Sequence, residues 1–258
     1  MRLRVAALCV AACLTCPAVT AAQTVSDLRP APAAPAAPVQ AVPDSFWTPF
    51  KAVPDDFARL STTDTVRILS LGAAGALAAH QWDGKGIEEA SEHFRPPAFT
   101  LGNVGGGFLI QAGAGFALYS VAKLSGSDQL SSVGADLVRA QILSQGLVQI
   151  GKFATRRSRP DGSDRYSLPS GHTASAFATA TVLQDHFGWK VGVPAYAFGA
   201  YVAASRMSAN KHHLSDVLFG AAIGIASART VTIGSGHARF NMGVAPTVGG
   251  AMVTFTKP

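Results

Sequence analysis

Apolar residues follow two patterns along the chain, and the longer pattern has the period of an α-helix. Between residues 65 and 231, six stretches rich in Ala, Leu, Val or Ile are bounded by Gly, Pro, Ser or Asp, as helices usually are. The predicted helices are Thr65–Gln81, Asn103–Leu124, Ser132–Lys152, His172–Phe187, Val191–Ser205 and Leu214–Val231. We therefore expect an all-α fold, a helical bundle of about six core helices.

The pattern changes in the C-terminal tail, residues 237–258. Apolar side chains there stand at alternate positions on both sides of a Gly-Gly pair, which is typical of two short strands joined by a tight turn. The apolar residues are Phe240, Met242, Val244, Met252, Val253 and Phe255. We expect a short C-terminal β-hairpin.

The first 22 residues have the composition of an export signal. Arg2 and Arg4 precede an apolar stretch, Val5–Val19, and small residues follow, with cleavage expected after Ala21 or Ala22. An uncleaved anchor helix is the alternative. All cysteines of the chain lie within this leader, so the mature protein is expected to have no disulfide. They are Cys9, Cys13 and Cys16.

Residues 23–44 are predicted to be a linker. Repeated prolines in Pro30–Pro43 deny the backbone helical hydrogen bonds and favour an extended tether. The helical domain is expected to cover residues 45–236, beginning near Ser45.

Composition limits where such a bundle can lie. Hydrophobic residues make up 48% of the chain and charged residues 14%, which favours a membrane protein or a tightly packed helical one. The net charge of +6 is too small to indicate nucleic-acid binding. Only Val104–Ala122 is a long uncharged run. We expect an exported protein in the periplasm or at the outer face of the inner membrane, partly embedded or lying on its surface. The sequence contains no indication of an oligomeric state.

Three segments carry side chains suited to a phosphoryl group. Lys152 supplies a point charge, and Arg159 and Arg206 supply planar forks that match phosphate oxygens. Ser170 and Gly171 precede a predicted helix, whose first N–H groups point toward a bound anion. Gly171 would let the backbone approach closely. Three cations and one helix start can thus meet at a single phosphate.

Two histidines can supply a nucleophile and a proton donor. His212 and Asp216 are four residues apart, which places them on one helix face if the helix begins nearby. A carboxylate on one imidazole nitrogen leaves the other nitrogen free to attack. His172 lies on another segment and can protonate the leaving oxygen. His213, three residues before Asp216, is the less favoured alternative nucleophile.

Together the segments resemble, in order and spacing, the signature of the type 2 phosphatidic acid phosphatase / vanadium haloperoxidase superfamily. That signature is Lys-x6-Arg-Pro, then Pro-Ser-Gly-His, then Ser-Arg-x5-His-x3-Asp, and every specified position is present between Lys152 and Asp216. The resemblance implies a helical bundle that hydrolyses phosphate esters without metal or other cofactor. It assigns phosphate binding to Lys152, Arg159, Arg206, Ser170 and Gly171. It assigns general-acid catalysis to His172, a phosphohistidine to His212 and the orientation of that histidine to Asp216.

The spacer between the first two motifs bears on the substrate. Only eight residues, Asp161–Leu168, separate Pro160 from Pro169, which resembles the membrane-lipid branch more than the exported acid phosphatases. We therefore expect a lipid-linked phosphate monoester or diphosphate, such as phosphatidic acid or prenyl diphosphate. The alternatives are a non-specific acid phosphatase acting on soluble esters, a vanadium haloperoxidase and a non-catalytic envelope protein.

Two further groups of residues are interpreted as uninvolved in the chemistry. Arg156 and Arg157 are expected to face solvent or lipid headgroups. A second group of acidic residues and histidines fits no tight ligand spacing, so no metal site is expected there. That group consists of His80, Asp83, Glu88, Glu89 and His93.

Overall fold

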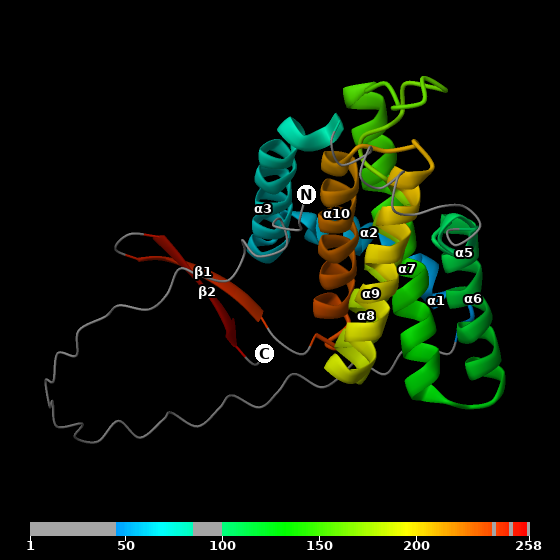
Figure 1. Cartoon of the computed structure of the whole chain (residues 1–258). Helices are drawn as coiled ribbons and strands as arrows, with labels where there is room; N and C mark the ends of the chain where they lie inside the picture. Colours follow the sequence, from blue (N-terminus) through cyan, green and yellow to red (C-terminus); the bar gives the residue numbers. More distant parts are fainter. Residues whose placement is uncertain (1–44, 85–99, 239–240, 248–249, 257–258) are drawn as a thin grey trace, which may run out of the picture. The chain divides into compact units, whose positions relative to one another are not determined.

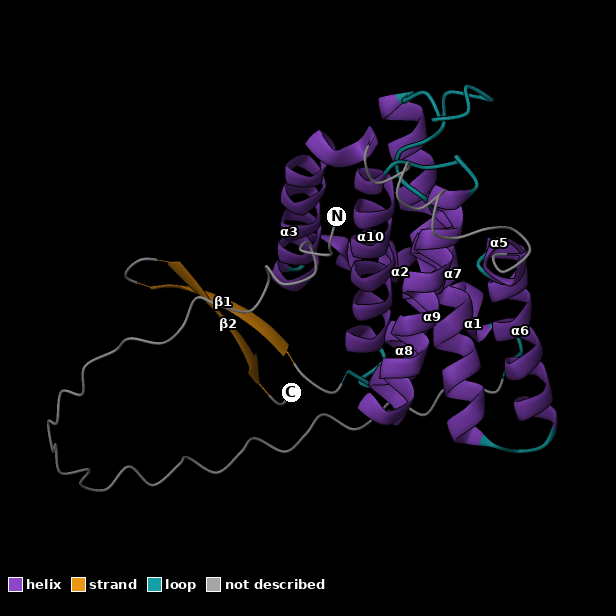
Figure 2. Ribbon diagram, in the orientation of Figure 1, coloured by secondary structure: helices purple, strands orange, loops and turns teal. Residues whose placement is uncertain are grey.

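The computed structural model describes residues 45–84, 100–238, 241–247 and 250–256 (Figure 1). These residues are helical apart from connecting loops and one two-stranded hairpin (Figure 2), which confirms the all-α prediction. The predicted leader and linker lie outside the described residues, as do Glu88, Glu89 and His93. The domain limits at residues 45 and 236 stay a prediction.

The helices match the predicted stretches to within a few residues at most ends. Four of the predicted helices contain or flank the motifs, and they appear as α7, α8, α9 and α10. The bounds are α1 Thr48–Lys51, α2 Val53–Ala58, α3 Thr63–Ala79, α5 Thr100–Gly105, α6 Phe108–Leu124, α7 Asp128–Thr155, α8 Gly171–Phe187, α9 Trp189–Ser208 and α10 Leu214–Gly234.

The prediction of one continuous helix over Asn103–Leu124 was wrong. The chain breaks between α5 and α6, where Gly107 takes an extended conformation at the N-cap. Glycine costs about 1 kcal/mol relative to alanine inside a helix. Gly105, Gly106 and Gly107 each carry this cost, so a continuous helix is disfavoured there. A Cβ on Gly106 would lie 2.4 Å from Cγ1 of Val202, so the break also lets the turn pack closely on α9.

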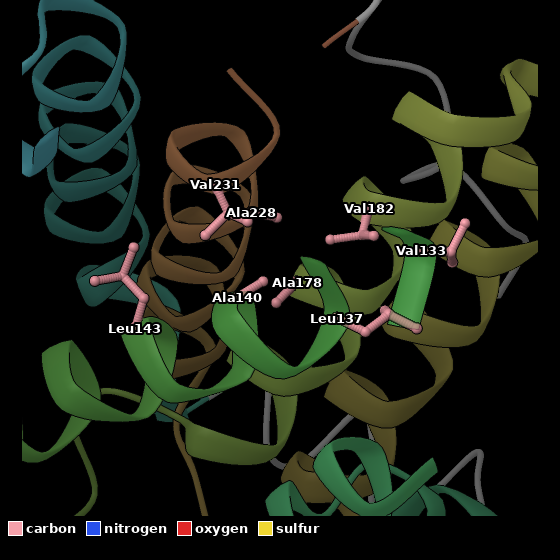
Figure 3. Close-up of a cluster of buried hydrophobic side chains, with 8 residues drawn as sticks. All are labelled: Val133, Leu137, Ala140, Leu143, Ala178, Val182, Ala228 and Val231. Atoms are coloured by element: carbon pink, nitrogen blue, oxygen red, sulfur yellow. The ribbon is translucent and has the colours of Figure 1, made fainter. Parts of the chain in front are cut away.

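The core lies where α7, α8 and α10 meet. Side chains from these three helices form one buried apolar cluster (Figure 3). Partly buried apolar side chains pack against it, namely Leu60, Leu118, Leu183 and Phe187. Each helix contributes residues three or four positions apart, the spacing of a single helix face. The cluster consists of Val133, Leu137, Ala140, Leu143, Ala178, Val182, Ala228 and Val231.

Glycines on α10 bring α8 into backbone contact. A Cβ on Gly220 would lie 2.6 Å from the carbonyl oxygen of Ser170, and one on Gly224 would lie 2.2 Å from that of Ala174. Both distances are shorter than real side chains tolerate, so glycine is required for this packing. The contact fixes the start of α8 against α10.

We expect Gly220→Ala to lower the free energy of unfolding by about 1–3 kcal/mol, because the added methyl group overpacks a rigid backbone contact. Urea denaturation measures the effect. Gly75→Ala is the matched control, since nothing lies within 4 Å of a Cβ there. That control should raise stability by about 0.5–1 kcal/mol, the usual gain on replacing a helical glycine. Equal stability of the two variants would contradict the close contact.

Consecutive helices run antiparallel from α7 to α10 (Figure 1). The last turns of α7 and α9 therefore lie at the same end of the bundle as the first turns of α8 and α10, as a hydrogen bond from the Ser170 N–H to the Asp216 carbonyl confirms. All three sequence motifs fall at this end.

Among the described residues, α10 is long and apolar enough to cross a membrane by length and composition. Within its most apolar window, 67% of the residues are buried inside the protein, and α6 is apolar but only 17 residues long. Core helices of soluble proteins pass the same test, so one such helix is weak evidence for a spanning segment.

The predicted C-terminal hairpin is present. Strand β1, Asn241–Thr247, pairs antiparallel with β2, Gly250–Thr256, in the register Thr247 opposite Gly250.

Candidate active site

His212 lies at the start of α10, almost completely buried with 2% of its surface exposed. Its Nδ1 is 2.7 Å from the carbonyl oxygen of Ser167. A carbonyl can only accept, so Nδ1 carries the proton and Nε2 carries the lone pair. Nε2 faces Nη1 of Arg159 at 3.4 Å. The imidazole is thus held with its unprotonated nitrogen toward a cation.

Charge and burial keep His212 neutral. Burial lowers the pKa of its imidazole to about 4, and the positive charges of Lys152 and Arg159 act in the same direction, against the opposing effect of Asp216. At neutral pH the ring therefore carries no charge, which is the state required of a nitrogen nucleophile.

Asp216 lies beside His212 but is not its closest hydrogen-bond partner. The distance from His212 Nδ1 to Asp216 Oδ2 is 3.8 Å. The same oxygen accepts hydrogen bonds from the Ser167 hydroxyl and from the His213 backbone N–H at 2.9 Å. Asp216 therefore acts on His212 largely through Ser167, whose carbonyl holds the ring.

His213 is the imidazole nearer to Asp216, with Nδ1 3.1 Å from Oδ2. It is the N-cap of α10 and forms a reciprocal capping box with Asp216, a structural arrangement that satisfies free N–H groups of the first turn. The shorter distance between His213 and Asp216 therefore does not identify His213 as the nucleophile.

Arg159 lies next to the free nitrogen of His212, and Lys152 and Arg206 lie near Arg159. Lys152 lies in the last turn of α7, Arg159 in the following loop, and Arg206 near the end of α9. Lys152 donates to the Tyr166 carbonyl at 2.5 Å, Arg159 binds Asp164 at 2.7 Å, and Arg206 donates to the Asn103 side chain at 2.8 Å. The structure therefore brings together the cations of two separate motifs.

These cations repel one another, and a bound anion would reduce that repulsion. Burial lowers the pKa of Lys152 to about 8, and the charge of Arg159 adds to that effect. Burial and Arg159 also lower the pKa of Arg206 to about 10. Nε of Arg206 is buried and has no hydrogen-bond partner among the described residues. An unsatisfied buried donor costs about 1–3 kcal/mol, which a bound phosphate oxygen would offset.

His172 lies in the first turn of α8, close enough to Arg206 and Lys152 to feel their charges. Burial lowers the pKa of its imidazole to about 4, and the charge of Arg206 acts in the same direction. The ring donates to the backbone carbonyl of Asn103. A second imidazole thus lies near the site, held by a residue of α5.

The start of α8 supplies the predicted backbone donors. Ser170 is the N-cap and Gly171 the first helical residue. The Ser170 hydroxyl accepts from Thr173 at 3.0 Å, which leaves its own proton for another acceptor. The first N–H groups of a helix have no acceptor within that helix, so this turn can bind an anion.

The interpretation of Arg157 as solvent-facing was wrong. Its guanidinium bridges Asp83 and Asp216, with Nη2 2.6 Å from Oδ2 of Asp83 and Nη1 2.6 Å from Oδ1 of Asp216. Asp83 in turn accepts from the Ser215 N–H at 2.8 Å. Arg157 faces inward because the end of α3 and the start of α10 each present a buried carboxylate that needs a cation.

Several of these supporting residues left no signal in the sequence. Ser167 acts through its carbonyl, which every residue has. Asn103 lies in a different helix from the motifs, 103 residues before Arg206. Asp83 was interpreted as uninvolved in the chemistry, yet its carboxylate binds Arg157 and the first turn of α10.

The arrangement is suited to phosphoryl transfer. A neutral imidazole presents its lone pair toward Arg159, and Lys152, Arg206 and the start of α8 lie nearby. Together these groups can hold the non-bridging oxygens of a phosphoryl group. The second imidazole can supply or accept a proton at the ester oxygen. Each group has a defined chemical task at one phosphorus atom.

The pKa values predict a bell-shaped pH profile for kcat/KM of the free enzyme. His212 acts when neutral, so activity falls as the pH drops through about 4. His172 acts when protonated, so its loss of a proton first lowers activity above the pH set by its pKa, which is about 4 in the free enzyme and is expected to be higher with substrate bound. Lys152 acts when charged, so activity falls again, at the alkaline limit, as the pH rises through about 8. Lys152→Arg should lower the maximum but move the alkaline limit upward, because arginine stays protonated. An unchanged alkaline limit in this variant would exclude Lys152 as its cause.

Comparison with known proteins gives the following similarities. The PAP2 superfamily pattern matches residues 149–240. Lipid A 1-phosphatase of Porphyromonas gingivalis is 44% identical over 86 residues, 32% of this chain and 19% of that protein. Lipid A 4'-phosphatase of Helicobacter pylori is 32% identical over 99 residues, 34% of this chain and 50% of that protein. The chain thus spans half or less of the length of these relatives.

Two crystal structures also resemble the chain. Aquifex aeolicus LpxE has a TM-score of 0.46 and 21% identity, covering 58% of this chain and 94% of that one. The first transmembrane PAP2 type phosphatidylglycerolphosphate phosphatase from Bacillus subtilis has a TM-score of 0.43 and 20% identity, covering 72% and 94%. Residues 149–240, the part of the chain that matches the PAP2 superfamily, contain every position of the three motifs.

Proposed function

We propose that the protein is a metal-independent phosphatase that hydrolyses a lipid-linked phosphate through a phosphohistidine at His212. The observation that carries the proposal is the state of that imidazole, which is neutral, hydrogen-bonded at Nδ1 and directed at Nε2 toward Arg159. A nucleophile in this state beside three cations has a clear use in phosphoryl transfer.

The proposed reaction has two steps. Nε2 of His212 attacks phosphorus in line with the ester bond, the P–O bond breaks, and His172 gives a proton to the leaving oxygen. Water then attacks the phosphohistidine, gives its proton to His172 and releases inorganic phosphate. The bound phosphoryl group offsets the cations that lower the pKa of His172, so we expect His172 to be more readily protonated with substrate bound.

The lipid nature of the substrate rests on two supports. The curated relatives that match residues of this chain are named as lipid A phosphatases. In addition, an apolar groove of about 360 Å³ adjoins Arg157 and Ser215, next to Asp216. Its lining comes mainly from α3 and α10 and comprises Ala73, Ala76, Leu77, His80, Arg157, Leu168, Ser215 and Phe219.

The proposed location is the bacterial cell envelope, with the site at the outer face of the inner membrane. The similarity to lipid phosphatases supports membrane association, and the leader expected from the sequence supports export. Fractionation of cells, followed by phosphatase assays on intact and permeabilised spheroplasts, tests the orientation. Activity only after permeabilisation would contradict the outward-facing site.

A substrate panel tests the function. The full chain, purified in detergent, is assayed for phosphate release from lipid A, phosphatidic acid, a prenyl diphosphate and p-nitrophenyl phosphate, with EDTA present. We expect release to persist in EDTA, to be highest with one of the lipids, and to be inhibited by vanadate, which mimics pentacoordinate phosphorus. Equal or better turnover of p-nitrophenyl phosphate would favour the non-specific acid phosphatase instead.

Two further outcomes would overturn the proposal. Halogenation in the presence of vanadate, bromide and peroxide, without phosphate release, would identify a haloperoxidase. No release from any lipid or soluble ester, by protein that is folded by circular dichroism, would indicate a non-catalytic envelope protein.

A further inference from the structure

A second group of histidines and carboxylates lies at the other end of the bundle from the candidate active site. Asp136 is in the third turn of α7, His186 is near the end of α8, and His237 follows the end of α10. Because these helices run antiparallel, their far ends meet there. One ligand atom from each of the three residues lies within 4.8 Å of the other two.

The contacts converge on one carboxylate oxygen. Oδ2 of Asp136 is 3.0 Å from Nε2 of His186 and 2.8 Å from Nδ1 of His237. The two imidazole rings lie with their centroids 4.3 Å apart. Asp136 is 1% exposed, so its charge cannot be met by bulk water and needs a positive partner.

The nearby arginines are shared with other carboxylates. Arg139 reaches Oδ1 of Asp136 at 3.2 Å, but it also makes a two-point contact with Asp56 at 2.6 and 2.8 Å. Arg229 binds Asp185. Asp56 also pairs with Arg59 at 3.5 Å, so three arginines match the three carboxylates, and the ligand geometry at Oδ2 of Asp136 is what indicates a metal.

We infer that Asp136, His186 and His237 form a structural zinc site that ties the segment after α10 to α7 and α8. Two imidazole nitrogens and one carboxylate oxygen are a donor set that zinc accepts. Ligand atoms on a tetrahedral zinc ion are about 3.3 Å apart, given bond lengths of about 2.0–2.1 Å. The pairs at 2.8 and 3.0 Å need to open by only a few tenths of an ångström.

The surroundings supply access, a fourth ligand and outer-shell support. An open cavity of about 410 Å³, lined in part by His186 and His237, adjoins the group and can deliver a water molecule. Arg139 at Oδ1 and the Ser235 hydroxyl, 2.9 Å from Oδ2, hold the Asp136 carboxylate in orientation, as outer-shell partners of metal ligands do. The site is independent of the proposed phosphatase function.

Zinc and cobalt titrations of the full chain test the inference. We expect about one Zn²⁺ per chain to depend on these residues, a rise in Tm with zinc concentration, and visible absorption bands of tetrahedral cobalt when Co²⁺ replaces zinc. Asp136→Asn and His237→Gln should each weaken binding at least about 100-fold and remove the Tm response. The difference between wild type and variants is the quantity measured, because Cys9, Cys13 and Cys16 can also bind zinc.

Ser235→Ala is the matched control. It removes a hydrogen bond to Asp136 but keeps all three ligands, so its zinc affinity should fall by about tenfold or less. Phosphate release should be unaltered in His237→Gln, whatever the outcome for zinc. Zinc binding and a Tm response that persist in His237→Gln, or the absence of both in the wild type, would overturn the site and leave a hydrogen-bonded network of histidines on Asp136.

Discussion

Replacement of His212 by asparagine should abolish phosphate release, with kcat falling on the order of 10⁴-fold or more, as expected for loss of a covalent nucleophile. Asparagine can keep a hydrogen bond to the Ser167 carbonyl, so the fold should be retained. Rapid acid-free quenching with radiolabelled substrate should detect a phosphohistidine in the wild type and none in the variant. A labelled His212→Asn protein would place the phosphoryl group on another residue.

His213→Asn is the matched control for this experiment. The neighbouring histidine is the nearer partner of Asp216 and caps α10, but its ring is not the one directed at Arg159. We expect a decrease in kcat of about tenfold or less, arising from a looser Asp216. If His213→Asn were the inactive variant and His212→Asn the active one, the assignment of the nucleophile would be reversed.

Arg157→Ala should be strongly destabilising although it lies outside the apolar core. Removal of the guanidinium leaves Asp83 and Asp216 buried without their shared cation, and breaking such a buried pair costs about 3–5 kcal/mol. Urea denaturation should show a lower midpoint. Because Asp216 also holds Ser167, and Ser167 holds His212, kcat should fall as well.

Arg156→Ala provides the comparison. Arg156 is exposed and stands at the C-cap of α7 in the left-handed conformation, with φ of 46°, which alanine must also adopt. Its loss should change stability by about 0.5 kcal/mol or less. Similar stability of the two variants would mean that the bridge between Asp83 and Asp216 contributes little.

The apolar pattern was sufficient to predict most of the fold. α8 and α10 begin within one residue of their predicted starts because Ser170 and His213 precede clear apolar periods. The break before α6 was missed, although Gly105, Gly106 and Gly107 were visible. Whether three glycines interrupt a helix depends on what packs against them, here Val202 on a helix that is distant in sequence.

The motifs allowed candidate phosphate-binding residues to be chosen but not the residues that contact and hold them. Lys152, Arg159 and Arg206 are recognisable because their spacing is fixed. The partner of Arg157 is 74 residues away at Asp83, and a buried arginine looks in sequence like any other member of a basic run. The zinc ligands that we infer are each separated by about fifty residues, so no local spacing marks them.

Lys152, Arg159 and Arg206 lie close together, and Nε of Arg206 has no hydrogen-bond partner among the described residues. This arrangement affects how the protein responds to phosphate in solution. A pocket that relieves this repulsion by binding a phosphoryl group does not distinguish the group on a substrate from the free anion after release. Inorganic phosphate should therefore compete with substrate, and turnover should slow as it accumulates. The concentration of phosphate around the site, rather than the supply of substrate, can then set the rate of the reaction.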